Sequence, residues 1–270
     1  MLILIARRLG SMVLIMFVVS VILFAIFESD KLAVAGKVLG PYSSTEQREI
    51  WLEQNGYNNP FWTRYVVWAG NAVRGDFGQS LQLKVPVSEV LWPRLANTGI
   101  LALFLFAIMI PLSLFMGVMA GMKEGSFRDR AITVFSVLTT SIPEFASATL
   151  LTAVFVFALG WLPGTSSMTG GFSFKELVLP VLVLLLYDFG YITRMTRASM
   201  AEVMNSQYIR TAILKGLPYK RVIVRHALRN ALIAPFTVIV LQLNWLLSGV
   251  IVVEVFFAYK GFGKLLLDAA

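Results

Sequence analysis

Long uncharged runs constrain this chain more than any other feature. Leu9 to Phe27 is a run of 19 uncharged residues, Leu95 to Met122 of 28, and Ala231 to Val253 of 23. A bilayer core about 30 Å thick is crossed by roughly 20 helical residues. The runs are continuously apolar rather than alternating, which is typical of membrane helices and not of strands in a barrel. We therefore predict an all-α integral membrane protein.

Two further apolar segments carry interruptions. Residues 131–160 contain Pro143, and residues 177–193 contain Asp188. Proline removes a helical hydrogen bond, so we expect the span that holds Pro111 to bend there and the span that holds Pro143 to be broken there. The chain then has five spans. Its predicted domains are an N-terminal transmembrane helix (1-27), an external segment with short helices (28-94) and a transmembrane core (95-270).

The segment 28–94 is too charged to lie in lipid, with seven Lys or Arg and seven Asp or Glu residues. The stretch Ser43-Ser44-Thr45 before a polar helix-forming segment predicts a capped helix start. Pro60 ends that helix, and Phe61 to Val73 is expected to form another, with aromatic residues suited to a membrane interface.

The distribution of basic residues predicts the orientation. With five spans and the N-terminus in the cytoplasm, the cytoplasmic segments hold 13 of the 23 Lys and Arg residues and three acids. Such an excess of bases is typical of cytoplasmic loops. The C-terminal residue, Ala270, is then expected outside. Topology explains the net charge of +8 without nucleic acid.

Several function classes lack the residues they need. The chain has no cysteine and one histidine, His226, which excludes cysteine chemistry and a multi-histidine metal site. A phosphate-binding Gly-x-x-x-x-Gly-Lys-Ser/Thr loop is also missing from the sequence. We expect a protein that is not an enzyme and binds no cofactor itself. The energy for any transport must come from a partner or from an ion gradient.

The stretch 194–230 is the main polar segment between two spans. It holds eight of the bases and one acid, Glu202. Tyr208 to Lys215 contains no helix breaker and is followed by Gly-Leu-Pro, so we predict a short helix there. Ile209, Ala212, Ile213 and Gly216 share i, i+3, i+4, i+7 spacing. We expect this apolar face to be exposed to the cytosol and covered by a protein partner, or to lie on the lipid surface.

The same stretch resembles a known family. Tyr208-Ile209-Arg210-Thr211-Ala212, Lys215-Gly216-Leu217 and the run from Arg225 to Ile233 resemble the cytoplasmic signature loop of ABC importer permeases. The branch is the one that takes up di- and oligopeptides, nickel chelates and some opines or sugars. The resemblance implies a type I ABC importer permease-like helical bundle whose coupling helix contacts an ATPase subunit. The residues it assigns to coupling are Tyr208, Ile209, Arg210, Ala212, Ile213, Lys215 and Gly216.

Other segments match the same family. They are Arg74 to Ser80, the Ser-x-Pro-x-Phe frame from Ser141 to Phe145, and Glu254 before an apolar-Phe pair. Tyr259 to Gly263 resembles an outer re-entrant segment, with lysine in place of a proline. The family has a sixth span after this point, which we expect beyond the sequence at hand.

The resemblance also implies partners. They are a homologous second permease subunit, two ATPase subunits that hold ATP and Mg, and an external solute-binding protein. The site of action would be the bacterial inner membrane. An ion- or proton-coupled secondary transporter remains the alternative; such a protein would work without ATPase subunits.

Acids inside spans are the candidate pathway residues. An acid in a span costs about 2.5–3.5 kcal/mol on insertion scales, so it normally faces a cavity or a partner. Glu144 and Asp188 are therefore predicted on the translocation path. Alternatively each pairs with Arg194, Arg197 or a backbone donor, or lies in water near a helix end. Two residues are expected in structural or gating roles, namely Pro143 and Glu254.

Overall fold

A computed structural model of the chain describes residues 2–80 and 83–269, and for residues 2 and 245–249 it describes the backbone alone. The contacts divide the chain into a first unit that ends at Trp92 and a second that starts at Pro93. Within the described residues every regular element is a helix, apart from one isolated bridge between Gln79 and Pro86. The predicted all-α fold class is confirmed.

The first unit contains one long helix and three short ones, namely α1 (Leu2–Glu28), α2 (Lys31–Leu39), α3 (Thr45–Gln54) and α4 (Phe61–Val73). Ser44 caps α3 as predicted: its hydroxyl accepts from the Gln47 backbone at 3.2 Å, and the Gln47 side chain accepts from the Ser44 backbone at 2.9 Å. The helix predicted over residues 61–73 is also confirmed. Helix α2 was not predicted from the sequence; Asp30 caps it.

Aromatic rings attach α4 to α1. The ring of Phe24 lies 5.5 Å from that of Tyr65 and 5.6 Å from that of Trp68. The Tyr65 hydroxyl is also 2.7 Å from that of Ser20. Arg64 of α4 forms an ion pair with Glu28 at the end of α1. The amphipathic helix α4 is therefore held against the last turns of the first apolar helix.

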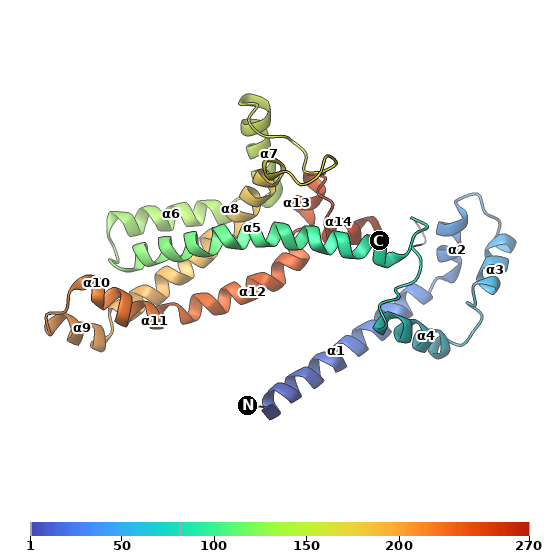
Figure 1. The fold of residues 1–270 in the computed structure, drawn as a ribbon, viewed down its shortest axis with the longest axis horizontal. Helices are drawn as coiled ribbons and strands as arrows, with labels where there is room; N and C mark the ends of the chain where they lie inside the picture. The colour runs from blue at the N-terminus through green and yellow to red at the C-terminus, as the bar shows by residue number, and fades with distance from the viewer. Residues whose placement is uncertain (1, 81–82, 270) are drawn as a thin grey trace. The chain divides into compact units, whose positions relative to one another are not determined.

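The second unit is a bundle around α8 (Phe174–Met204), against which α6 (Phe127–Ser141), α7 (Glu144–Thr152) and α12 (Ile233–Gly249) pack. Figure 1 shows α5 (Val87–Gly121) running along the same bundle. One end of the bundle carries α9 (Gln207–Leu214), α10 (Tyr219–Arg221) and α11 (Leu228–Ala231). The other end carries α13 (Ile251–Phe256) and α14 (Phe262–Ala269). Two π-helical turns follow α7 and α10, at Ala153–Ala158 and Val222–Ala227.

Among the described residues, three helices can cross a membrane by length and composition, namely α1, α5 and α8. Two bent pairs add up to two more, α6 with the helix from Glu144 to Ala158 and the helix from Tyr219 to Ala231 with α12. These elements correspond to the five predicted spans.

The predicted break at Pro143 is confirmed. The helices on its two sides are inclined by 98°, so the third apolar segment turns sharply instead of crossing straight. Pro143 has no N–H to donate, and it occupies the N-cap position of α7. Pro111 lies within α5, which continues through it as one helix.

Small residues let α5 and α6 approach α8 closely. A Cβ added to Gly121 of α5 would lie 2.6 Å from the Arg197 carbonyl oxygen of α8, and one on Gly117 would lie 2.7 Å from that of Thr193. On α8 itself, Gly190 faces the Ser136 carbonyl of α6 with no room for a Cβ. Small residues at such crossings are typical of membrane helices, where lipid tails give no hydrophobic drive for association.

Replacing Gly190 with alanine is expected to separate α6 from α8, because the new methyl group overlaps the Ser136 backbone. Overpacking of this kind costs about 1–3 kcal/mol. Thermal unfolding of the purified protein in detergent should show a lower midpoint for Gly190→Ala. The matched control is Gly99→Ala on α5, where nothing lies within 4 Å of the added atom. Equal midpoints for the two variants would contradict the packing argument.

Candidate coupling surface and translocation cavities

The helix predicted from Tyr208 to Lys215 exists as α9, from Gln207 to Leu214. Its inner face is buried within the chain itself: Ile209 is fully buried and Ala212 nearly so. They pack in a cluster with buried residues of neighbouring helices, namely Met200, Val222, Ile223, Ala227 and Ala231. The prediction that Ile209 and Ala212 are exposed to the cytosol or to a partner is therefore wrong. The chain itself covers Ile209 and Ala212, whereas Ile213 and Gly216, which the spacing placed on the same face, are exposed.

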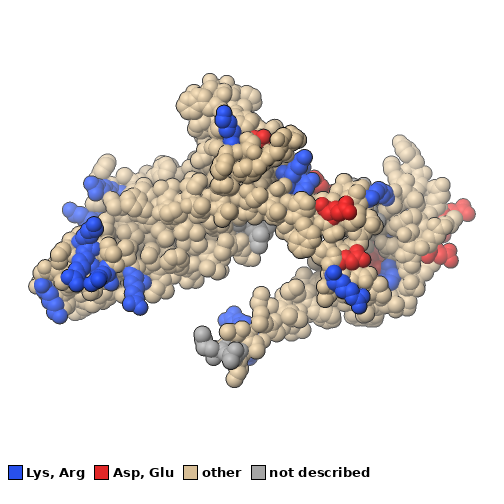
Figure 2. Space-filling model, viewed as in Figure 1, with Lys and Arg blue, Asp and Glu red and all other residues tan. Residues whose placement is uncertain are grey.

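The outward face of α9 is different. Tyr208, Arg210, Ile213 and Lys215 are exposed, and Leu214 is 80% exposed. Lys and Arg residues gather at this end of the second unit, and no Asp or Glu is visible there on the face in Figure 2. The arrangement presents an apolar tip among basic side chains. It can bind a surface that has an apolar pocket and acidic residues around it.

Gly216 ends α9 in a left-handed conformation, with φ of +74°. Its N–H donates to the Ile213 carbonyl at 2.9 Å, and the Leu217 N–H donates to that of Ala212 at 3.3 Å. Residues with a side chain rarely adopt this backbone conformation, which explains why glycine stands at this position. Substitution of Gly216 or Ala212 would therefore disturb the helix itself before it reached any partner.

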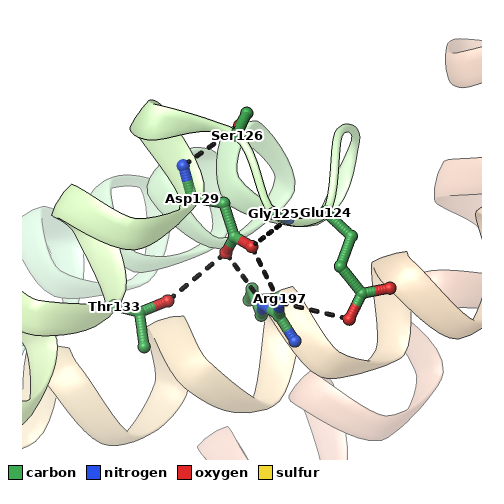
Figure 3. A network of polar contacts seen from close by, with 6 residues as sticks. All are labelled: Glu124, Gly125, Ser126, Asp129, Thr133 and Arg197. Carbon is green, nitrogen blue, oxygen red and sulfur yellow. Dashed lines mark hydrogen bonds and ion pairs between the residues drawn. The ribbon is translucent and has the colours of Figure 1, made fainter.

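A polar network connects the turn after α5 to α8 (Figure 3). The Asp129 carboxylate is buried at the start of α6 and accepts from Arg197 Nε at 2.9 Å and Nη2 at 2.7 Å. It also accepts from the Gly125 N–H at 2.9 Å. Glu124 lies 3.3 Å from the same guanidinium. Two parallel bonds from one arginine fix its orientation, so this network braces α6 against α8.

This network excludes Arg197 as the partner of the two acids in the spans, Glu144 and Asp188. Arg197 is engaged by Asp129 and Glu124, and does not pair with Glu144 or Asp188. Asp188 instead accepts a hydrogen bond of 2.6 Å from Gln242 Nε2 of α12. It is 2% exposed and lies in the middle of α8, not near water at a helix end. Gln242 was not identified from the sequence, since an uncharged amide in an apolar run has no distinctive pattern.

Two cavities adjoin one another beside these acids. One has a volume of about 430 Å³ and is lined by residues 140–145, with Glu144 among them, and by Tyr187 and Val252. The other, of about 270 Å³, is lined by Asp188, Tyr191, Arg194 and Gln242. Thr140 and Tyr187 belong to both linings. The structure thus brings Glu144 and Asp188 to one region, although 43 positions separate them in the sequence.

Glu254 lies at the opposite end of the bundle from α9 and is fully buried. Its carboxylate accepts from Thr98 Oγ1 at 2.6 Å and from the Lys264 N–H, in the first turn of α14, at 2.8 Å. Gly261 and Gly263 have no room for a side chain beside this carboxylate. The acid therefore holds the re-entrant segment against α5. Sequence reasoning identified Glu254 but not its partner Thr98.

The chain matches a family model described as the binding-protein-dependent transport system inner membrane component, over residues 113–270. It is 37% identical over 240 residues to the oligopeptide transport system permease protein AppB of Bacillus subtilis (strain 168), covering 86% of this chain and 76% of that protein. It is 32% identical over 287 residues to the dipeptide transport system permease protein DppB of Alkalihalophilus pseudofirmus, covering 97% of this chain and 86% of that protein.

A third relative is the glutathione transport system permease protein GsiC of Escherichia coli O1:K1 / APEC, 33% identical over 263 residues, with 97% of this chain and 85% of that protein covered. These matches extend over nearly the whole chain, including the segments that surround both cavities and α9. The chain therefore belongs to the family of binding-protein-dependent inner membrane components, which are permease subunits of ABC importers that work with ATPase and binding-protein components, and not secondary transporters or enzymes.

Proposed function

We propose that this chain forms one half of a pathway that carries short peptides into the cell. The other half would be a homologous second permease subunit. Two ATPase subunits would bind ATP and Mg at the cytoplasmic side, and an external binding protein would deliver the peptide. The names of three relatives, which transport oligopeptides, dipeptides or glutathione, support this substrate class.

The exposed outer face of α9 is the observation that carries the coupling part of the proposal. Leu214 and Ile213 form an apolar tip in an otherwise basic surface. Leu214 is 80% exposed, so a partner that covers this apolar side chain lowers the free energy of the complex. The nearby bases Arg210 and Lys215 would meet acids on the ATPase and fix its orientation.

Glu144 and Asp188 are proposed to line the pathway, because both face cavities within the span region. The same helix, α8, carries Asp188 and leads through Met204 to α9. A displacement of α9 by the ATPase subunits would thus reach the cavity through one continuous helix, while Pro143 holds the turn that forms its other wall.

Leu214→Asp is expected to abolish coupling while leaving the fold intact, since the side chain is exposed in this chain. An unpaired carboxylate in the covered interface costs several kcal/mol. Uptake by the reconstituted importer should fall at least tenfold, and loaded binding protein should no longer stimulate ATP hydrolysis. Leu39→Asp on α2, also exposed, is the control and should transport normally. Normal uptake in Leu214→Asp would rule out the coupling surface.

The proposed orientation can be tested cleanly because the chain has no cysteine. Tyr42, which is fully exposed, is proposed outside, and Arg128, which is exposed in the first turn of α6, inside. In intact cells a membrane-impermeant maleimide should label Tyr42→Cys and leave Arg128→Cys unlabelled, and opening the cells should allow labelling of Arg128→Cys. Labelling of Arg128→Cys in intact cells would contradict the proposed topology.

Glu254 is proposed as a structural acid of the outer re-entrant segment, not a gate. Glu254→Ala would leave the buried Thr98 hydroxyl and the N–H groups of α14 without an acceptor, at about 1–3 kcal/mol for each group. We expect a lower unfolding midpoint and faster proteolysis after Tyr259. Glu254→Gln keeps one acceptor oxygen, so its unfolding midpoint should lie between those of the wild type and Glu254→Ala. A wild-type midpoint in Glu254→Ala, with altered transport, would favour gating instead.

A further inference from the structure

The two adjoining cavities differ in the charge they present. The larger contains the Glu144 carboxylate, and the smaller contains the Arg194 guanidinium together with Asp188. Thr140 and Tyr187, which both cavities share, supply hydroxyl groups between the two ends. The combined space thus has an acid at one end, a base beside a second acid at the other, and uncharged hydrogen-bonding groups in the middle.

Glu144 has unused hydrogen-bonding capacity. Its Oε1 atom is shielded from solvent, and no residue in the described part of the chain donates to it. A buried carboxylate oxygen without a donor is costly, so such an atom points to a ligand or ion that completes it. Burial of this atom within a cavity lining leaves room for a donor that belongs to another molecule.

Arg194 also lacks a charged partner among the described residues. Its Nε donates to the Gly190 carbonyl at 3.2 Å and its Nη2 to Thr140 Oγ1 at a long 3.4 Å. Among the described residues no acid lies within ion-pair distance of it, in contrast to Arg197, which holds Asp129. Asp188 in the same cavity is engaged by Gln242 instead. A guanidinium in this state can take a carboxylate in a bidentate pair.

We propose that the two cavities form one subsite for a short zwitterion, in which Glu144 binds a free peptide amino terminus and Arg194 binds the free carboxyl terminus. This inference rests on the proposed transport of peptides and deepens it. Both termini carry charges that cost much to bring into a low-dielectric span without partners. The subsite supplies one partner for each terminus, and Tyr187 and Thr140 face the peptide backbone between them.

The dimensions fit a di- or tripeptide. Thr140, which Arg194 contacts, precedes Glu144 by four residues, which bounds the separation of their Cα atoms at about 14 Å. A peptide extends by roughly 3.3–3.6 Å per residue. Because Arg194 Nη2 lies 3.4 Å from Thr140 Oγ1, this bound limits the separation of the two charged groups to the length of a few peptide residues.

A purely structural role for Glu144 makes a different prediction. The residue starts α7, and an acid in a first turn stabilises a helix through its dipole. In that case replacing Glu144 would weaken the binding of all peptides alike. The subsite, by contrast, requires that each variant lose discrimination for one terminus only. The two interpretations therefore separate in a comparison of peptides that differ at one end.

The test uses the complete importer complex in nanodiscs, without binding protein, in nucleotide-free and vanadate-trapped states. Calorimetry would measure binding of trialanine, its N-acetylated form and its C-terminal amide. In at least one state the wild type should bind trialanine about tenfold more tightly than either blocked form, a difference of about 1.4 kcal/mol. Glu144→Gln should remove the penalty for acetylation alone, and Arg194→Gln that for amidation alone.

Controls and failures are distinguishable. Glu49→Gln and Arg130→Gln, both exposed and outside the two cavities, should behave as the wild type, and Arg194→Lys should restore part of the preference for a free carboxylate. Equal affinities for all three peptides, a uniform loss in the variants, or no binding in either state would overturn the subsite. The proposed function fails separately, if the complete importer with its binding protein takes up no member of a mixed peptide pool.

Discussion

Close approach of helix backbones at glycine is the constraint on which the second unit depends. In lipid an apolar side chain gains little by leaving the tails, so association has to come from packing and polar contacts. Gly117 and Gly121 of α5 and Gly190 of α8 remove the side chains that would hold three backbones apart. Because α8 is fixed on two sides in this way, the residues on its remaining face keep defined positions. The cavity residues and the Arg197 brace are consequences of that geometry.

Buried polar groups divide into two sets on this scaffold. Asp129 with Arg197, Glu254 with Thr98, and Asp188 with Gln242 form complete contacts between different helices. Each pair joins elements that lie far apart in the sequence. The contact between the two groups offsets the free energy needed to bury them and fixes which helices pack together. Glu144 and Arg194 form the second set, since neither has a charged partner among the described residues. The contrast within one bundle separates groups that hold the fold from groups available to a ligand.

The sequence predicted what depends on local pattern. Uncharged runs located the membrane helices, Pro143 the interruption of the third apolar segment, and the residues from 61 to 73 a helix, because each follows from chain chemistry over a few turns. It could not predict which face of α9 is buried. The spacing of Ile209 and Ala212 says that one side is apolar, whereas what covers that side depends on Met200, Val222 and Ala227, which only folding brings there. Gln242 was missed for the same reason, since its significance lies entirely in its distance from Asp188.

The length of α8 connects the two ends of the proposed mechanism. Its 31 residues extend for about 46 Å as one helix, from the loop before Phe174 to the turn before α9. Asp188, Arg194 and Arg197 all lie on it, and Arg197 ties it to α6, whose far end carries the Pro143 turn and Glu144. A force applied at α9 therefore cannot move Arg194 without also moving the wall that holds Glu144. If the two residues bind opposite ends of one peptide, a displacement of α9 therefore acts on both ends of that site at once.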